Sequence, residues 1–304
     1  MPNETFANIT LMGGLGRMIA KRLHPYIRIA RFDNPIGSWL LFWPCAWGLS
    51  LASVQAQIWP SFYLLSLFGL GAVIMRGAGC VYNDLIDRNF DGQVARTKNR
   101  PLPSGQISVL HAWLFLCTLC AIGFIILIQF DIATIALGFM SLALVAIYPF
   151  MKRITWWPQF FLGLAFNWGA LMGYAAHWGD ISMGAIMLYI GGIFWTMGYD
   201  TIYAHQDKED DAILGIKSSA RRLGQHSPIA LYVFYTLTLF CCGLAIWDGA
   251  LGAYSWLGLA AAGGHLFWQI RRLDIDNSAL CLRLFKSNRE FGFLLWLAIL
   301  VGLF

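Results

Sequence analysis

The chain has 304 residues, of which 58% are hydrophobic and 12% are charged, and its formal net charge is +5. A soluble globular domain carries about 25% charged residues, so this composition excludes a soluble globular protein and indicates a polytopic membrane protein. The net positive charge reflects the Lys and Arg residues that determine membrane topology, and it gives no support for nucleic-acid binding.

In chain order, a basic N-terminal segment over 1–31 precedes about nine apolar segments. Most of them approach the roughly 20 residues that a helix needs to cross about 30 Å of hydrocarbon. The chain is therefore predicted to form one all-α membrane domain over 1–304, a bundle of about nine transmembrane helices. The apolar segments are 36–55, 61–82, 109–129, 131–150, 157–176, 183–203, 229–247, 250–268 and 291–304.

Lysine and arginine fall on one side of the predicted membrane. Every one of them lies before the first apolar segment or after an even-numbered one, except Arg76 inside the second. The positive-inside rule then predicts a cytoplasmic N-terminus and a C-terminus on the opposite side. The expected location is a bacterial inner membrane, with membrane lipid as a partner.

Half of the 16 acidic residues gather in two short windows. The first window, NDLIDRNFD, follows the second apolar segment. Its carboxylates are spaced i, i+3 and i+7, so on a helix they share one face. Hard oxygen ligands of this kind suit Mg²⁺. The candidate ligands are Asn83, Asp84, Asp87 and Asp91.

The second window, YDTIYAHQDKEDD, follows the sixth apolar segment. Asp200, Tyr203 and Asp207 repeat the same spacing, and Asp211 continues the predicted face by one turn. Carboxylates so close together repel one another unless a cation binds them. Two such windows favour a metal site that holds a polyphosphate, while the simpler alternative is that the acids are solvated loop residues.

Basic loops adjoin both windows, and Lys/Arg side chains beside metal-bound phosphate are typical of diphosphate sites. Arg221 and Arg222 are interpreted as ordinary positive-inside residues. The candidate diphosphate-binding residues are Lys98, Arg100, Lys152, Arg153 and Lys217.

Several stretches resemble the UbiA-type intramembrane prenyltransferases. NDLIDRNFDGQVARTKNRPLPSG and GYDTIYAHQDKEDDAILGIKSSARRLG look like the family's two acidic motifs. RFDNPIGSWLLFWPCAWGL and YPFMKRITWWPQFFLG resemble its 4-hydroxybenzoate branch. The resemblance implies helices around a central cavity, capped on the cytoplasmic side by the loops after the second and sixth helices.

The resemblance also implies transfer of a polyprenyl group from polyprenyl diphosphate to the ring carbon ortho to the hydroxyl of 4-hydroxybenzoate, an early step of ubiquinone biosynthesis. Mg²⁺, as two ions, is the implied cofactor. The acceptor is expected to contact Arg31, Tyr148 and Tyr203, although Asn34 stands where the family often has Lys. The implied catalytic residues are Asp84, Asp87, Asp200 and Asp207, and the implied metal ligands are the seven oxygen-bearing residues Asn83, Asp84, Asp87, Asp91, Asp200, Asp207 and Asp211.

Two alternatives remain open. A prenyltransferase of the same superfamily could use another acceptor, such as homogentisate, a naphthoate, haem, chlorophyllide or a phospho-sugar. A metal-coupled transporter is the alternative of a different class, because acids within membrane proteins often mark ion paths. Transport sites usually lie near the middle of the bilayer, whereas these acids follow the ends of apolar segments.

Overall fold

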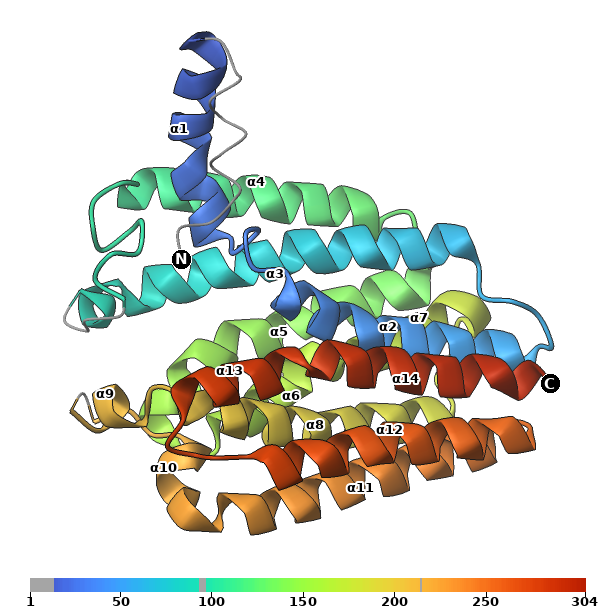
Figure 1. Cartoon of the computed structure of the whole chain (residues 1–304). Helices are drawn as coiled ribbons and strands as arrows, with labels where there is room; N and C mark the ends of the chain where they lie inside the picture. Colours follow the sequence, from blue (N-terminus) through green and yellow to red (C-terminus); the bar gives the residue numbers. More distant parts are fainter. Residues whose placement is uncertain (1–13, 93–96, 214) are drawn as a thin grey trace. The chain divides into compact units, whose positions relative to one another are not determined.

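The computed structural model describes the backbone of residues 14–92, 97–213 and 215–304, and it leaves the side chains of 14–21, 89–91 and 210 undescribed. Across those residues the fold is helical and contains no strand (Figure 1). The predicted all-α class is therefore confirmed. The chain forms two compact units, one over 1–35 and 73–123 and the other over 36–72 and 124–304.

The smaller unit contains α1 (Gly14–Ile29), most of α3 (Phe62–Asp91) and most of α4 (Val109–Leu127). Its apolar core includes Ile29, Val81, Leu85 and Leu119, all nearly inaccessible to solvent. Because this core encloses the C-terminal half of α3, it holds the first acidic motif in a fixed environment.

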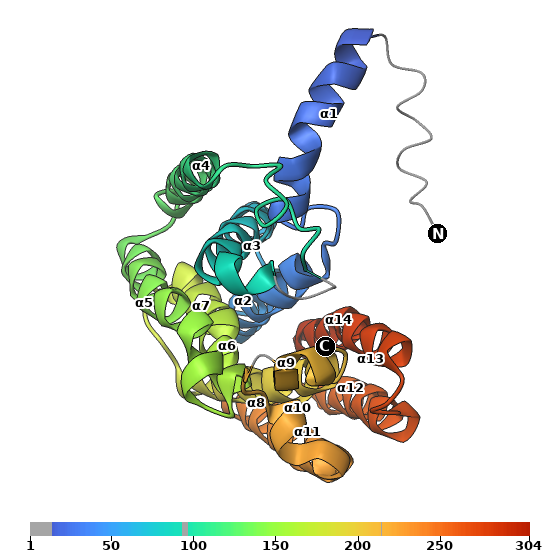
Figure 2. The same ribbon diagram turned by 90° about the vertical axis from the view of Figure 1, so that its left-hand side faces the viewer.

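The larger unit is a bundle in which α8 packs against α11 and α12 packs against α14 (Figure 2). Its helices are α2 (Ile36–Gln55), α5 (Ile132–Ile154), α6 (Pro158–Asn167), α7 (Gly169–Trp178), α8 (Met183–Ala204), α9 (Lys208–Ile213), α10 (Ser219–Leu223), α11 (Ser227–Asp248), α12 (Ala253–Arg272), α13 (Ser278–Lys286) and α14 (Asn288–Leu300), with short 3-10 turns at Gly224–His226 and Val301–Leu303.

Aromatic rings fill the centre of this bundle. The Trp195 ring lies 5.2 Å from that of Trp47 and 5.1 Å from that of Phe291. The Trp47 indole donates to the Gly292 carbonyl at 2.9 Å, and the Trp195 indole donates to Asn288 Oδ1 at 2.8 Å. These bonds satisfy the only polar atom of each buried indole, so α2, α8 and α14 are joined by packing and hydrogen bonds together.

Four stretches are long and apolar enough to cross a membrane within the described residues: Phe62–Arg88, Val109–Leu127, Ile132–Ile154 and Ser219–Asp248. Together with the composition they identify an integral membrane protein. The number of nine spans and the central cavity stay predictions.

The helix expected over the apolar segment 157–176 is interrupted once, at Trp168, because α6 ends at Asn167 and α7 begins at Gly169. The Asn167 amide donates to the Gly163 carbonyl at 2.9 Å and to Thr196 Oγ1 at 2.8 Å. A side chain that bonds to its own backbone and to a neighbouring helix competes with regular helical bonding, and a hydropathy pattern does not reveal it.

Candidate functional site

The first acidic motif lies on the last turns of α3, which contains Asn83, Asp84, Asp87 and Asp91. Asp84 is 1% exposed and Asp87 is 2% exposed, while Asn83 is half-buried. The side chain of Asp91 lies outside the described residues. Burial of two carboxylates on adjacent turns is costly without cationic partners, so their surroundings decide what this motif can bind.

Two arginines meet the Asp84 carboxylate. Arg31 Nη2 lies 3.1 Å from Asp84 Oδ1 and 3.4 Å from Oδ2, and Arg100 Nη1 lies 3.3 Å from Oδ1. Arg31 has a φ of +57° at the turn after α1, and its Nη1 donates to the Arg28 carbonyl at 2.9 Å. This unit therefore joins the predicted acceptor residue Arg31 and the predicted diphosphate residue Arg100 to the predicted metal ligand Asp84.

The loop after α3 is anchored to the end of α1. Arg28 Nη2 donates to the Asn99 carbonyl at 3.3 Å, and Leu102 belongs to the same core as Ile29. Lys98 is exposed, so its ammonium is accessible from solvent. The arrangement places one anchored arginine, Arg100, and one accessible lysine in the segment that follows the motif.

The second acidic motif departs from the predicted continuous helical face. α8 ends at Ala204, so Asp200 and Tyr203 are helical, but Asp207 lies in the turn before α9 and Asp211 lies in α9 itself. The amides of 205, 206 and 207 each donate to a carbonyl three residues earlier. Such bonds tighten and end a helix, and HQDKEDD offers no apolar residue that could continue the buried face.

Residues of the second motif are less buried than those of the first. Asp200, Asp207 and Asp211 are all half-buried, as is the predicted acceptor residue Tyr148. The Tyr203 ring lies 4.5 Å from the ring of Phe285 in α13, centroid to centroid. Tyr203 therefore packs α13 against the end of α8.

The loop after α9 is attached to the end of α5. The Lys217 amide donates to the Lys152 carbonyl at 2.9 Å, and Lys217 Nζ donates to the Ile154 carbonyl at 3.0 Å. Arg153 is exposed beside them. The predicted diphosphate residues Lys152, Arg153 and Lys217 thus gather in one place, where the Lys217 ammonium also satisfies the C-terminal end of a helix.

Arg221 has a structural role that sequence reasoning missed. Its Nη1 donates to the Asp211 carbonyl at 3.2 Å and to the Ile216 carbonyl, and its guanidinium lies 5.4 Å from the centroid of the Trp156 ring. The side chain therefore ties α9 to the following loop. The pattern of positive charge does not separate this role from an ordinary topological arginine.

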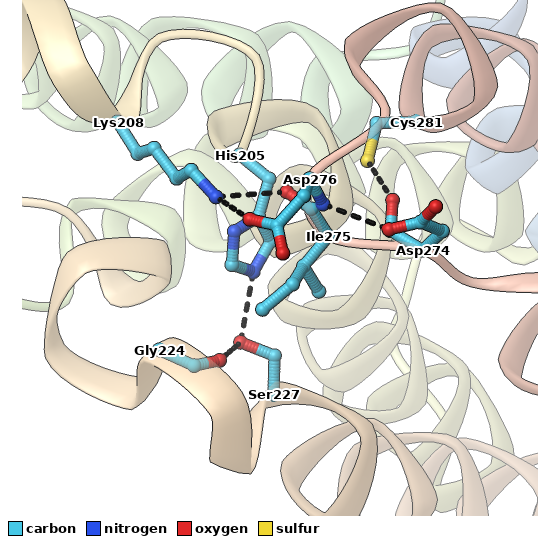
Figure 3. Close-up of polar contacts among 8 residues, drawn as sticks. All are labelled: His205, Lys208, Gly224, Ser227, Asp274, Ile275, Asp276 and Cys281. Atoms are coloured by element: carbon cyan, nitrogen blue, oxygen red, sulfur yellow. Dashed lines mark hydrogen bonds and ion pairs between the residues drawn. The ribbon is translucent and has the colours of Figure 1, made fainter.

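His205 is a buried neutral residue. Burial, reinforced by the nearby Lys208 ammonium, lowers the pKa of His205 to about 4. Its Nε2 shares a 2.8 Å hydrogen bond with Ser227 Oγ, and Ser227 Oγ donates to the Gly224 carbonyl at 2.8 Å (Figure 3). A neutral imidazole held in this way connects the end of α8 to the start of α11 and supplies no positive charge for phosphate.

Lys208 forms a second unpredicted contact. Its ammonium pairs with the Asp276 carboxylate and donates to the Ile275 carbonyl at 3.1 Å (Figure 3). The hydrogen bond from Lys208 lowers the pKa of Asp276. These atoms come from residues about 67 positions apart in the sequence, so no local pattern could have indicated the pair.

Within the described residues, no three His, Cys, Asp or Glu side chains group closely enough to form a complete metal centre. Such a group is not needed for Mg²⁺, which commonly takes one or two carboxylates and fills its remaining positions with water and substrate phosphate. The carboxylates at the end of α3 are donors of the correct type for this ion.

Comparison with known proteins gives one consistent result. Residues 41–298 match the UbiA prenyltransferase family. A mitochondrial 4-hydroxybenzoate polyprenyltransferase of Aedes aegypti is 49% identical over 92% of this chain, which spans 63% of that protein's length. The human protein of the same name is 44% identical over 92% of this chain and 76% of its own length.

Solved structures agree on the fold. A UbiA homolog from Aeropyrum pernix K1 superposes with a TM-score of 0.68 at 22% identity, covering 86% of this chain and 96% of that one. A UbiA homolog from Archaeoglobus fulgidus, bound to DMAPP and Mg²⁺, gives 0.67 at 18% identity, covering 91% and 97%. The names of the sequence relatives place those proteins in mitochondria, so they lend no support to the predicted bacterial inner membrane.

Proposed function

Because this chain belongs to the UbiA prenyltransferase family, we propose that it transfers a polyprenyl group from polyprenyl diphosphate to 4-hydroxybenzoate, as an early step of ubiquinone biosynthesis. The observation that carries the proposal is the cluster formed by Arg31, Asp84 and Arg100, with Asp87 buried on the next turn. Cationic and anionic groups are both present there, as a carboxylate acceptor and a metal-bound diphosphate require.

Mg²⁺ is the proposed cofactor, and two ions, one for each acidic motif, are the proposed number. Asp84 and Asp87 fit this ion because they are hard oxygen donors on adjacent turns of one helix. The remaining proposed ligands are Asn83, Asp91, Asp200, Asp207 and Asp211. When bound, Mg²⁺ would offset the negative charge that develops on the diphosphate leaving group.

The basic residues would hold the diphosphate. Lys98 is exposed and free to reach phosphate oxygens, and Arg100 already lies against the first motif. Lys152, Arg153 and Lys217 form the corresponding group beside the second motif. Lys/Arg contacts to phosphate oxygens are charge-assisted hydrogen bonds, roughly twice as strong as neutral ones, so these residues would orient the donor.

Arg31 is proposed to bind the carboxylate of 4-hydroxybenzoate, and Tyr148 and Tyr203 are proposed to line the acceptor site. In the reaction the allylic carbon–oxygen bond breaks and its electron pair leaves with the diphosphate. The ring carbon ortho to the hydroxyl then bonds to the allylic carbon and loses its proton. Apolar walls must exclude water, since water would otherwise capture the allylic cation.

The experiment that tests this function is mass spectrometry of products from the purified chain, supplied with Mg²⁺, a set of polyprenyl diphosphates and 4-hydroxybenzoate. We expect the acceptor mass to increase by one polyprenyl group in place of a hydrogen. Asp87→Asn should lower the rate about 100-fold or more, since charge stabilisation by one group is commonly worth that much. Asp180→Asn, in the exposed loop between α7 and α8, is the matched control and should retain the parent rate.

Two results would overturn the proposal. Prenylation of homogentisate or a naphthoate, with 4-hydroxybenzoate left unchanged, would assign a different acceptor. Metal-dependent flux across proteoliposomes without any covalent product would favour the transporter alternative.

A further inference from the structure

The position of Lys208 at the start of α9 is unfavourable for the helix itself. It is the first residue of a helix of six residues, Lys208–Ile213. Positive charge at a helix N-terminus opposes the helix dipole, and an isolated helix shorter than about 12 residues is marginal in water. α9 therefore depends on tertiary contacts, and the Lys208 side chain supplies one by extending to Asp276 and the Ile275 carbonyl.

The loop between α12 and α13, which receives Lys208, is internally braced. The Asp276 amide donates to Asp274 Oδ1 at 3.0 Å, and Cys281 Sγ donates to the Asp274 carbonyl at 3.3 Å (Figure 3). Asn277 Oδ1 accepts from the Leu280 amide at 3.0 Å and begins α13. A braced loop offers Lys208 a fixed acceptor, so the contact can restrain α9.

The segment that bears Asp207 is held from two directions. On one side His205 bonds to Ser227 at the start of α11, and on the other Lys208 bonds to the loop before α13. Asp207 lies between these two anchors, and its carbonyl accepts from the Asp211 amide at 2.8 Å. Motion of Lys208 would therefore change the positions of Asp207 and Asp211.

We propose that Lys208, through Asp276 and the Ile275 carbonyl, is a positioning residue that holds Asp207 and Asp211 in place for the donor diphosphate. This inference rests on the proposed function. It assigns to the α12–α13 loop the role of a brace for the second acidic motif, and it separates Lys208 from the lysines that would touch phosphate directly.

The test compares Lys208→Met with the parent chain. The substitution keeps an apolar stem of similar length and removes the ammonium. Hydrogen–deuterium exchange, measured without substrate or Mg²⁺, should become faster in peptides over 207–213. The Michaelis constant for the donor should rise about fivefold, because apparent affinity falls with the fraction of molecules in the competent conformation. The turnover number should stay within about a factor of two of the parent.

Three further variants sharpen the test. Asp276→Asn removes the negative charge but keeps an acceptor oxygen, so it should raise the Michaelis constant for the donor by a smaller factor. Lys208→Arg should recover part of the parent affinity, since a guanidinium can reach the same acceptors. Lys286→Met, at an exposed position in the last turn of α13, is the matched control and should behave like the parent.

Unchanged exchange over 207–213 in Lys208→Met would overturn the anchoring role. Faster exchange with an unchanged Michaelis constant would overturn the positioning role, and a raised constant with unchanged exchange would make Lys208 a direct phosphate contact instead. A parent chain that forms no product with any donor would sink the proposed function, while the exchange measurement would still decide whether Lys208 restrains α9.

Discussion

The Asp84 carboxylate bonds to two arginines, one before it and one after it in the sequence. Arg31 lies 53 residues earlier and Arg100 lies 16 residues later. The sequence identifies Asp84 as a candidate ligand from its spacing, but it assigns Arg31 to a different partner. The pairing depends on the turn after α1, where Arg31 has a positive φ, and hydropathy and charge patterns carry no information about that backbone conformation.

The double role proposed for Arg31 leads to a prediction about Arg31→Gln. Loss of a charge-assisted bond to the acceptor carboxylate removes about 1.5–3 kcal/mol, so the Michaelis constant for 4-hydroxybenzoate should rise roughly ten- to hundredfold. Steady-state kinetics with 4-hydroxybenzoate and with its uncharged amide would measure this effect, and the amide should be nearly insensitive to the substitution. If instead the half-saturating Mg²⁺ concentration moves and the acceptor constant does not, Arg31 acts only through Asp84.

Helix packing in the larger unit depends on glycines that let backbones approach closely. A Cβ at Gly48 in α2 would clash with the Ala170 carbonyl of α7, and a Cβ at Gly173 in α7 would clash with the Cys45 carbonyl of α2. In lipid there is no hydrophobic driving force between helices, so close packing at small residues stabilises such crossings instead. The crossing of α2 and α7 is therefore fixed by two reciprocal glycines.

Gly48→Ala should accordingly destabilise the protein by about 1–3 kcal/mol or more, because the added methyl meets backbone rather than a movable side chain. The midpoint of thermal unfolding in detergent would fall. Gly264→Ala in α12 is the matched control, since a Cβ there meets nothing within 4 Å and alanine favours a helix by about 1 kcal/mol over glycine. Equal midpoints for Gly48→Ala and the parent would show that the helices can separate without cost.

The helices differ in how far the sequence alone predicts them. The apolar segment 36–55 coincides with α2, and the segment 183–203 ends one residue before α8 does. Both are continuous apolar runs of about the length needed to cross a membrane. The break after Asn167 and the turn at 205–207 depend on side-chain and backbone hydrogen bonds instead. The division into α6 and α7 and the geometry of the second acidic motif could therefore not be predicted from periodicity.

At the level of the whole chain, composition and charge distribution were the strongest predictors. They indicated an all-α membrane protein, and the structure and the relatives agree on both points. The residue types of the candidate site were predictable for the same reason, since acids and bases are rare in this chain and their clusters stand out. Contacts such as those of Lys208 and Arg221 were not predictable, because they join charged side chains to backbone carbonyls across loops.

The face of the membrane on which each later loop lies depends most on whether α6 and α7 cross it. Each has 10 residues, which at 1.5 Å per residue is about 15 Å and too short to cross about 30 Å of hydrocarbon alone. The pair must cross together if the predicted topology is correct. Between Gln106, in the exposed loop before α4, and Asp180, in the exposed loop after α7, the chain would then cross the membrane three times, through α4, through α5 and through the α6–α7 pair.

Single substitutions Gln106→Cys and Asp180→Cys test this crossing in sealed vesicles of known orientation, with an impermeant maleimide and the parent chain as background. We expect Gln106→Cys to be labelled from the side that carries the basic loops and Asp180→Cys from the opposite side, because the lysines and arginines retain their loops on one face. Labelling of both from the same side would contradict the predicted topology, because α4, α5 and the α6–α7 pair would then not each cross the membrane once. The Lys217 amide bonds to the Lys152 carbonyl at 2.9 Å, so the end of α5 and the loop after α9 must lie on one face. The α6–α7 pair and α8 must therefore cross the membrane an even number of times between them.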